Sequence, residues 1–495
     1  MVESRNFYLN LPSKVRDYML DVFEASDDVR IVQKKLRDIG SPKLHMDDIR
    51  EALVMSYSDC GESEIAIELA RIFNEQSPTP NMHNLVLKVM LGSWSYTQQR
   101  FLDESCEWAR RYAEQSDEAL SLHHHERPRV GLVCDYGSTV FGNNAIFPMA
   151  GGLIENGLDV YYYNFEDREY NASGDHFIIA NVHALTSHQL SERIRHDQID
   201  VLIDLNGRLR DHHRLGVFCR RSAPIQVNYF NLVGTMGMKN YDYMIVDDVQ
   251  VPVADERYYL EKAIRLPCGV NGAFSFTRDV EISIPDKGAS EPFIFASFNA
   301  FFKINTLLLE AWAEILQRAP HSKLVIQCAE TERDRVIRKI AGVFGKRNVD
   351  MSRIIIDGWS SLDKMRRQYG KVDLCLDTFP YSGGSTTLNA LWQGVPVLTW
   401  CGDGWRARSS ASMLTAAGLE ELVVFSREDY IEQAVALAEA RSRVTAMRRH
   451  LAGTVAENRY FRPDIVYVDL ARALACLCET AGKSGVAAPN HMMTS

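Results

Sequence analysis

The sequence lacks several features that would assign it to a large class of proteins. Among its 495 residues, no apolar run reaches the roughly 18–20 residues needed to span a bilayer. Met1 to Asn10 has neither the basic start nor the apolar core of a secretory signal. The ten cysteines are scattered rather than spaced as a disulfide framework. These absences predict a cytoplasmic protein with reduced thiols and no membrane association.

Metal and nucleic-acid binding also find little support. Cys476 and Cys478 form a CxC pair, but no second Cys or His pair lies near them in the sequence to complete a zinc site. The adjacent histidines 123–125 would point in different directions on a helix, which disfavours shared ligation. A formal net charge of −10 disfavours a broad nucleic-acid surface, because phosphate neutralisation needs clustered Lys and Arg. We therefore expect no metal, no other cofactor and no nucleic-acid partner.

The first part of the chain has helical periodicity, from about Lys14 to Glu114. Its candidate helices are Asp47 to Ser56, Ser63 to Phe73, Asn84 to Leu91 and Gln98 to Tyr112. They form pairs at a spacing of about 35–40 residues, which predicts degenerate tetratricopeptide-like repeats. Two interpretations stay open at this point. Such repeats can present a groove to peptides, or they can form a cap that only packs on the next domain.

Beyond a polar linker, short apolar runs alternate with helical segments, a pattern typical of a parallel, doubly wound sheet. The first set of predicted strands is Arg129 to Cys134, Asp159 to Tyr163, Asp200 to Leu205 and Tyr243 to Val246. The second set is Phe293 to Phe298, Lys323 to Gln327, Arg353 to Ile356, Leu374 to Leu376 and Val395 to Thr399. Two such units in tandem predict two Rossmann-like lobes that face a cleft. A final helix, Asp464 to Cys478, is expected to cross back to the first lobe.

The predicted organisation is therefore an α/β protein whose two lobes follow an all-α domain. The expected parts are an all-helical, repeat-like domain (1–120), a linker (121–128), a first lobe on the acceptor side (129–288), a second lobe with the C-terminal helix on the donor side (289–480) and a disordered tail (481–495).

The clearest chemical signal is the segment DTFPYSGGSTT, Asp377 to Thr387, which follows a predicted strand and leads into a predicted helix. Its glycines allow close backbone approach, and its hydroxyl side chains stand where the free N–H groups of a helix start point outward. These residues are Gly383, Gly384, Ser385, Thr386 and Thr387. No Lys follows the glycines as in a Walker loop, and the GxGxxG pattern is absent. A phosphate site at the helix start and a tight turn with a Ser/Thr cap both stay open.

Two basic residues near strand ends are candidate phosphate ligands. Lys303 closes SFNAFFK, Ser297 to Lys303, just beyond a predicted strand on the face that the cleft should share. A Lys at this place would neutralise the charge that builds on a diphosphate leaving group. An ordinary surface charge is the alternative. Arg208, in LNGR, follows another strand end and could also bind phosphate.

Four segments together resemble one family. They are SFNAFFKI, DTFPYSGGSTTLNALWQGVPVLTW (Asp377 to Trp400), ARSSAS (Ala407 to Ser412) and SAPIQVNYFNLVGTMG (Ser222 to Gly237). The chain resembles the catalytic region of bacterial O-GlcNAc-transferase and SPINDLY-like proteins, glycosyltransferase family 41, in the same order from about Arg129 to Leu474. The resemblance implies a GT-B fold and inverting, metal-independent transfer from a nucleotide sugar to a protein side chain. The family also commonly carries tetratricopeptide repeats ahead of the catalytic unit.

The resemblance also implies a donor site. Lys303 would contact the donor diphosphate, as would Gly384, Ser385 and Thr386 at the start of the helix that follows the glycines. Gly234 and Thr235 would lie near the sugar. Met365 and Asn389 stand where the family places a base-stacking His and a ribose-bonding acid, so the donor base stays open, with a UDP-sugar favoured. The full predicted donor site is Phe298, Asn299, Lys303, Gly383, Gly384, Ser385, Thr386, Thr387, Asn389, Met365, Gly234, Thr235 and Arg208.

The general base is less defined. Thr139 stands where the family typically has a His after the first strand, so a base role for that His does not transfer. His196, at a predicted helix end, and Asp135, at a strand end facing the cleft, are the candidates beside Lys303 for the catalytic residues. Either could take a proton from an acceptor hydroxyl within about 3 Å. For His196, a partly exposed surface position is the alternative.

The sequence thus predicts an inverting glycosyltransferase that moves a sugar from a nucleotide-sugar donor to a protein or peptide side chain. Homodimerisation stays open. One alternative is a glycosyltransferase of small molecules or a nucleotide-sugar epimerase, which the helical domain disfavours because neither needs a peptide groove. Another is a catalytically weak partner protein, which the retained Lys303 and GGSTT disfavour because a scaffold needs no phosphate site.

Overall fold

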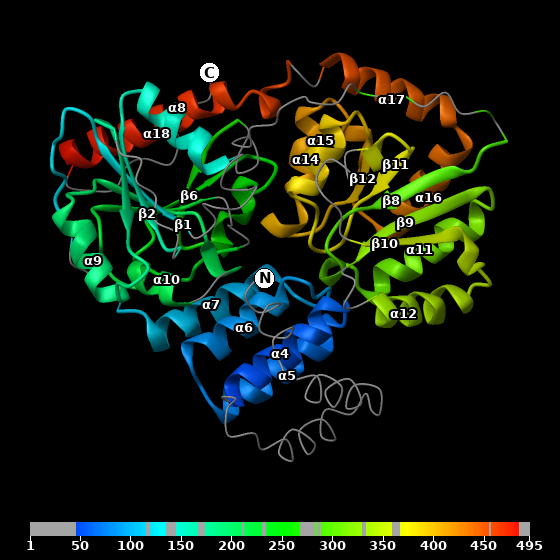
Figure 1. The fold of residues 1–495 in the computed structure, drawn as a ribbon, viewed down its shortest axis with the longest axis horizontal. Helices are drawn as coiled ribbons and strands as arrows, with labels where there is room; N and C mark the ends of the chain where they lie inside the picture. Colours follow the sequence, from blue (N-terminus) through cyan, green and yellow to red (C-terminus); the bar gives the residue numbers. More distant parts are fainter. Residues whose placement is uncertain are drawn as a thin grey trace.

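The computed structural model describes most of the chain as a helical unit and two α/β lobes (Figure 1). Asp135, Thr139 and Met365 lie outside the described residues, as does most of the predicted tail. The described residues are 46–114, 119–134, 145–166, 174–209, 212–229, 234–267, 282, 284, 288, 290–328, 333–358, 367–454 and 457–484.

Four consecutive helices form the helical unit and confirm the four predicted segments. They are α4 (Met46–Asp59), α5 (Ser63–Gln76), α6 (Pro80–Met90) and α7 (Gln98–Tyr112). The hydroxyl of Thr79 accepts the N–H of Met82 at 3.1 Å, and the hydroxyl of Thr97 accepts the N–H of Arg100 at 3.2 Å. These caps fix where α6 and α7 begin, because each satisfies an N–H group that has no partner within its helix.

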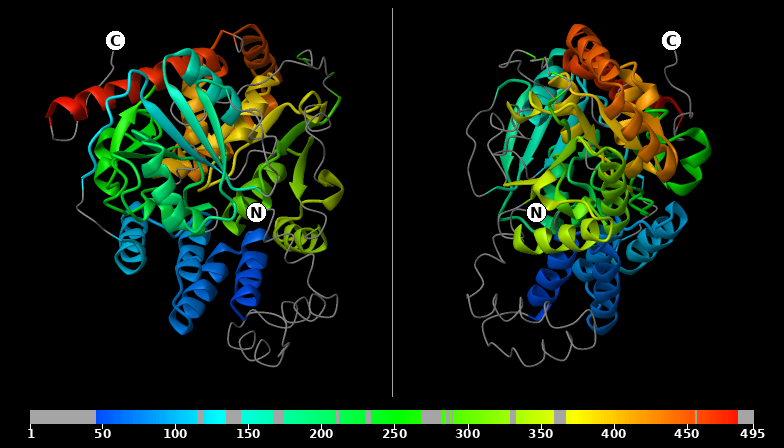
Figure 2. Two further views of the ribbon diagram at one scale, coloured as in Figure 1. Left: turned by 60° about the vertical axis from the view of Figure 1, so that its left-hand side comes forward. Right: turned by 90° about the vertical axis from the view of Figure 1, so that its right-hand side faces the viewer.

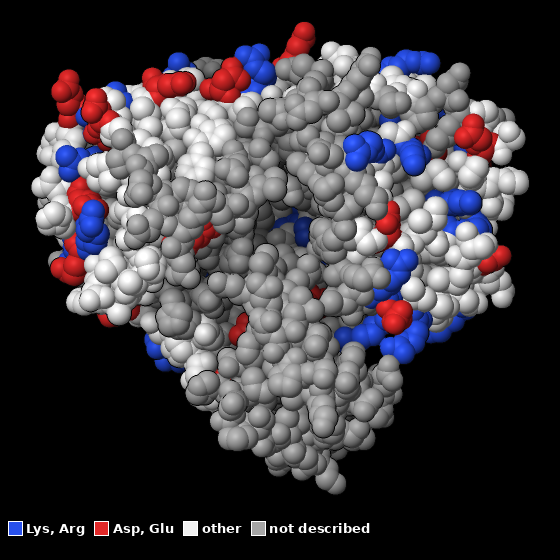
Figure 3. Space-filling view, viewed as in Figure 1, with Lys and Arg blue, Asp and Glu red and all other residues white. Residues whose placement is uncertain are grey.

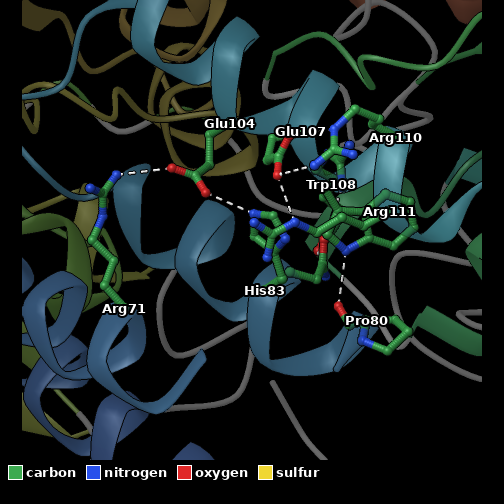
Figure 4. Close-up of polar contacts among 10 residues, drawn as sticks. Arg71, Pro80, His83, Glu104, Glu107, Trp108, Arg110 and Arg111 are labelled. Atoms are coloured by element: carbon green, nitrogen blue, oxygen red, sulfur yellow. Dashed lines mark hydrogen bonds and ion pairs between the residues drawn. The ribbon is translucent and has the colours of Figure 1, made fainter. Parts of the chain in front are cut away.

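Polar contacts join α5, α6 and α7 (Figure 4). His83 of α6 is buried, and its Nε2 lies 2.7 Å from Oε1 of Glu104 in α7. The other oxygen of Glu104 accepts from Arg71 of α5 at 3.0 Å, and Nε1 of Trp108 donates to the carbonyl of Pro80 at 2.9 Å. The hydrogen bond from His83, followed by the charge of Arg71, lowers the pKa of Glu104. Its carboxylate therefore stays ionised and holds three helices together.

The first lobe contains a seven-stranded parallel sheet in the order β3-β2-β1-β4-β5-β6-β7. Its strands are β1 (Arg129–Cys134), β2 (Asp159–Asn164), β3 (Phe177–Asn181), β4 (Val201–Asp204), β5 (Ile225–Asn228), β6 (Tyr243–Val246) and β7 (Lys262–Arg265). The helices are α8 (Phe147–Glu155), α9 (Ser187–His196) and α10 (His212–Phe218). The four predicted strands are confirmed, whereas β3, β5 and β7 were not predicted.

The second lobe contains a six-stranded parallel sheet in the order β10-β9-β8-β11-β12-β13. Its strands are β8 (Phe293–Ser297), β9 (Ser322–Cys328), β10 (Ile354–Gly358), β11 (Leu374–Leu376), β12 (Val397–Trp400) and β13 (Val423–Val424). The helices are α11 (Thr306–Arg318), α12 (Arg333–Gly345), α14 (Ser385–Trp392), α15 (Ser409–Ala416), α16 (Arg427–Glu439), α17 (Arg441–Thr454) and α18 (Pro463–Ser484). All five predicted strands are confirmed, and the fold is the predicted pair of Rossmann-like lobes.

The two sheets stand side by side, and the helical unit lies below both of them in the view of Figure 1 (Figures 1 and 2). Helix α18 crosses back to pack on α8 of the first lobe, as predicted, so closely that a Cβ on Gly152 would lie 2.4 Å from Tyr467. The lobes also touch directly, because the hydroxyl of Tyr460 donates to Oδ2 of buried Asp247 at 2.9 Å. Among the described helices, none combines the length and apolar character needed to cross a membrane.

Candidate active site

The predicted phosphate segment and Lys303 meet at one end of the second sheet. Strands β8 and β11 are neighbours, and the chain order reverses between them. Asp377 follows β11 directly, and the short 3-10 helix η5 (Phe301–Lys303) follows β8. In open parallel sheets, ligands bind outside the carboxyl ends of the strands at such a reversal. Lys303 and Ser382 are 79 positions apart in sequence, yet they are in hydrogen-bond contact here.

Asp377 organises the loop that follows β11. Its Oδ1 accepts the backbone N–H of Gly383 at 2.8 Å and the amide of Asn299 at 3.3 Å, while Oδ2 accepts the hydroxyl of Thr399 at 2.7 Å. Burial raises the pKa of Asp377, and these hydrogen bonds oppose that shift. The buried carboxylate thus fixes the glycine loop against the ends of both neighbouring strands.

Helix α14 begins at Ser385, directly after the glycine loop. Its N-cap is Gly384, the side chain of Ser385 is exposed, and Thr386 is half-buried. The hydroxyl of Thr386 donates to Oδ1 of Asn299 at 2.7 Å. Because the first N–H groups of a helix have no partner within it and carry partial positive charge, this start is suited to an anion such as phosphate.

Gly383 is required by the close packing of this helix start. A Cβ at this position would lie 2.2 Å from Oγ1 of Thr387 and 2.9 Å from Oγ1 of Thr386. We expect Gly383→Ala to lower the free energy of unfolding by about 1–3 kcal/mol, because the added methyl group overpacks the loop. Chemical denaturation would measure this loss. The matched control is Gly151→Ala in α8, where a Cβ meets nothing within 4 Å and stability should stay equal or rise; equal losses for both variants would contradict the packing argument.

Lys303 is half-buried beside this loop. Its Nζ donates to the carbonyl of Ser382 at 2.9 Å and lies 3.8 Å from the centroid of the Tyr381 ring. The amide of Asn305 holds the two loops together by donating to the carbonyl of Phe379 at 2.8 Å. Burial lowers the pKa of Lys303 to about 8, although the nearby carboxylate of Asp377 acts in the opposite direction. The ammonium therefore has a carbonyl and an aromatic face as partners and can still accept an anion.

One face of the molecule is hollowed (Figure 3). In the space-filling view, a depression lies between the two lobes above the helical unit, and Lys or Arg side chains are visible within it (Figure 3). Within the part of the chain that the structure describes, no group of three or more His, Cys, Asp or Glu side chains could hold a metal ion. Beside the helix start, Lys303 supplies a basic side chain, and the first backbone N–H groups of α14 carry partial positive charge.

The sequence model of glycosyl transferase family 41 matches residues 163–270 and 276–467, which include strands β3 to β13 and the loops described above. The chain belongs to glycosyltransferase family 41. Its curated relatives include the probable UDP-N-acetylglucosamine--peptide N-acetylglucosaminyltransferase SPINDLY of Solanum lycopersicum, 27% identical over 72% of this chain and 39% of the relative. Another is the probable UDP-N-acetylglucosamine--peptide N-acetylglucosaminyltransferase SEC of Arabidopsis thaliana, 30% identical over 66% of this chain and 34% of the relative. The chain therefore spans well under half the length of these plant relatives.

Solved structures agree with this family assignment. A mutant form of the Thermobaculum terrenum O-GlcNAc transferase is 27% identical, with a TM-score of 0.77 over 91% of this chain and 88% of that chain. Sucrose-phosphate synthase of Thermosynechococcus elongatus, at 12% identity and a TM-score of 0.50 over 71% of this chain and 100% of that chain, shares the fold alone. The two lobes thus have the GT-B fold of family 41 enzymes.

Two predicted donor ligands of the second lobe lie beside the helix start. The ring of Phe298 packs edge-on against Tyr369 at 4.6 Å between centroids, and the hydroxyl of Tyr369 donates to the carbonyl of Thr386 at 3.1 Å. The amide of Asn389 donates to the carbonyl of Ser385 at 2.7 Å, while its buried Oδ1 has no partner. Both side chains therefore brace the first turns of α14 from inside the lobe.

Arg208 does not join this group. It is buried, its Nη1 donates to Oδ1 of Asn84 in α6 at 3.2 Å, and its guanidinium lies 4.8 Å from the ring of Trp108 in α7. Burial lowers its pKa to about 10, so the side chain stays charged at neutral pH. The structure places Arg208 between the first lobe and the helical unit, where its hydrogen bonds go to protein groups. The structure does not bring Arg208 to Lys303, and its contact with phosphate stays a prediction.

Gly234 and Thr235 also face the helical unit and the interior of the first lobe. A Cβ on Gly234 would lie 2.4 Å from the Phe101 ring of α7. The hydroxyl of buried Thr235 donates to Oε2 of Glu261 at 2.7 Å. Neither is in contact with the Lys303 group, so a role near the sugar remains a proposal that depends on how the lobes close on a donor.

His196 is the last residue of α9, and its side chain is 86% exposed. In a parallel sheet with crossover helices, a helix ends near the amino end of the strand that follows it. His196 precedes β4 and so lies at the edge opposite to the carboxyl ends of the strands. The structure therefore does not place His196 at the carboxyl ends of the first-lobe strands. Lys303, by contrast, follows the carboxyl end of β8 in the second lobe.

Proposed function

We propose that this family 41 protein is an inverting glycosyltransferase that moves a sugar from a nucleotide-sugar donor, with a UDP-sugar favoured, to a side chain of a protein or peptide. We further propose that it acts in the cytoplasm. The observation that carries the proposal is the contact of Lys303 with Ser382, in the loop that leads into α14, at the strand reversal. This place offers positive charge and free N–H groups together, which suits a diphosphate.

In the proposed reaction, an acceptor oxygen attacks the anomeric carbon while the bond from that carbon to the diphosphate oxygen breaks. The leaving nucleoside diphosphate gains negative charge, and the ammonium of Lys303 and the N–H groups of α14 stabilise it. The acceptor hydroxyl must lose its proton as the new bond forms. Asp135, which follows β1 directly in sequence, is the group we propose for this step.

The test is a screen of UDP-, GDP- and dTDP-sugars for binding and for release of the nucleoside diphosphate, with and without peptide acceptors. We expect a UDP-sugar to raise the melting temperature and to give acceptor-dependent release of UDP. Donor binding without any transfer to an acceptor would favour the catalytically weak partner protein. Absence of binding by every nucleotide sugar would reject the proposal.

The affinity for UDP should depend on pH through Lys303. The pKa of Lys303 in the free protein is lowered to about 8, and a bound diphosphate favours the protonated amine. Affinity should therefore be highest below this value and fall as the pH rises through it, by up to about tenfold per pH unit. Isothermal titration calorimetry between about pH 7 and pH 9.5 would measure the decline. The Lys303→Met variant should show a flat profile, and a decline that persists in this variant would contradict the assignment.

A further inference from the structure

One short segment of the second lobe contacts all three parts of the molecule. It is the 3-10 helix η8 (Trp405–Ala407). The backbone N–H of Trp405 donates to the hydroxyl of Tyr259 in the first lobe at 3.3 Å. The next residue, Arg406, reaches the helical unit with its side chain and the donor loop with its backbone carbonyl. A structural change in any of these three parts would therefore act on the residues of η8.

The side chain of Arg406 is bound to the end of α6. Its Nη1 donates to the carbonyl of Met90 at 2.9 Å and to that of Leu91, and Nη2 donates to the carbonyl of Ser93 at 3.0 Å. The guanidinium also lies 3.7 Å from the centroid of the Tyr96 ring. The last carbonyls of a helix lack helical partners and carry partial negative charge, so a cation there is stabilised. Arg406 is only 2% exposed, and this contact is closed to solvent.

The backbone of Arg406 continues this contact to Lys303. Its carbonyl accepts both the N–H and the hydroxyl of Ser382, each at 2.9 Å. The carbonyl of Ser382 in turn accepts Nζ of Lys303 at 2.9 Å. Arg406, Ser382 and Lys303 thus form a connected series of hydrogen bonds from the end of α6 to the amine of Lys303.

The helical unit also supports the Lys303 loop from its other side. A Cβ on Gly61, between α4 and α5, would lie 2.0 Å from the carbonyl oxygen of Ile304. A Cβ on Gly92, after α6, would lie 3.2 Å from the carbonyl oxygen of Phe302. The backbone on both sides of Lys303 therefore rests directly against the helical unit.

We propose that Arg406 is a positioning residue for Lys303, and that the helical unit is a structural part of the donor site. This inference rests on the proposed function, because it assumes that Lys303 binds the donor diphosphate. Arg406 holds Ser382 in place through its carbonyl only while its guanidinium is fixed to α6. Loss of that anchor frees Ser382 and with it the amine of Lys303. The helical unit then contributes to donor binding through this contact.

The test is a double-mutant cycle on the full chain, with UDP as the probe in isothermal titration calorimetry. We expect Arg406→Met to weaken UDP binding at least about tenfold, the loss expected when a contact to a charged group is misplaced. Lys303→Met should weaken binding further. The double variant should bind no more weakly than Lys303→Met alone, because residues that act through one another are not additive. The pH at which affinity declines should also rise in Arg406→Met, since a freed Lys303 is better hydrated.

Two further variants keep the outcome clear. Arg335→Met removes another contact between the second lobe and the helical unit, from Nη1 to the hydroxyl of Ser56 at 2.8 Å, and should leave UDP affinity unchanged. Ser382→Ala deletes the hydroxyl bond to the carbonyl of Arg406 and the long bond from the N–H of Ser410 at 3.5 Å, but it keeps the backbone bond to Arg406. It therefore provides a milder variant if Arg406→Met fails to fold, and about threefold weaker binding is expected.

The inference is overturned if Arg406→Met, or Ser382→Ala where the former does not fold, binds UDP as the wild type does. It is also overturned if the losses from Arg406→Met and Lys303→Met simply add, because Arg406 would then act independently of Lys303. Failure of the proposed function gives a different result, in which the wild-type protein itself binds neither UDP nor GDP.

Discussion

We expect Lys303→Met to lower kcat/KM for sugar transfer by about 10²–10³-fold while the protein stays folded. The amine contacts the carbonyl of Ser382 in the loop that leads into α14, where we propose that the diphosphate leaves, and Met has a similar length but no charge. Folding should not suffer, since the lowered pKa of Lys303 shows that burial disfavours its charged form. Removing that charge lifts the penalty, which is present below about pH 8 and disappears as the amine deprotonates. Steady-state kinetics with a UDP-sugar and calorimetric melting would measure both effects.

Two controls define what the loss of Lys303 means. Lys346→Met removes an exposed lysine beyond α12 and should leave kcat/KM unchanged. Lys303→Arg keeps the charge but places a wider planar group against Tyr381, so an intermediate loss is expected. Wild-type kcat/KM in Lys303→Met would remove this residue from the mechanism, whereas equal losses in both Lys303 variants would show that its shape matters more than its charge.

Two of the strands that the sequence analysis did not predict, β5 and β7, combine apolar with polar or charged residues. Strand β5 (Ile225–Asn228) lies inside the sheet, yet it contains Gln226 and Asn228, both fully buried. The amide of Gln226 is satisfied by the carbonyl of Asn240 at 2.8 Å, so a polar side chain in the core is tolerated. Strand β7, KAIR, is at the sheet edge and partly exposed. Neither strand shows the apolar run by which strands are recognised.

Site residues can be predicted from the sequence where they depend on the order of the strands, but not where they depend on contacts between distant segments. Lys303 and the 377–387 segment each stand directly after a strand, so the topology alone brings them to one edge. The contact of Arg406 with Met90 joins residues that are 316 positions apart. No pattern or spacing in the sequence predicts this contact. Arg208 also follows a strand, but its neighbour Asn84 is 124 positions away. A position after a strand therefore predicts that a residue lies at an edge of the sheet. It does not predict whether a ligand or another domain covers that residue.

Asp377→Ala is expected to have the largest effect on stability, lowering the free energy of unfolding by about 3–5 kcal/mol. The substitution removes the acceptor of three buried groups: the N–H of Gly383, the amide of Asn299 and the hydroxyl of Thr399. Each buried donor that loses its partner costs about 1–3 kcal/mol. Because Gly383 and Asn299 also fix the start of α14, UDP binding should weaken in the same variant. Chemical denaturation and calorimetric titration would measure the two losses.

Asp377→Asn and Asp204→Ala separate the causes of this effect. Asn keeps an oxygen that can accept the N–H of Gly383, and its amide can donate to the hydroxyl of Thr399. Asp377→Asn should therefore lower the free energy of unfolding by about 1 kcal/mol or less. A loss as large as that of Asp377→Ala would instead show that the negative charge is essential. Asp204, the last residue of β4, is also a buried carboxylate that fixes a loop. It accepts the N–H of Gly207 at 3.0 Å and the hydroxyl of Tyr241 at 2.6 Å. Asp204→Ala should therefore cost similar stability yet leave UDP affinity unchanged in the protein that remains folded, because its loop belongs to the first lobe.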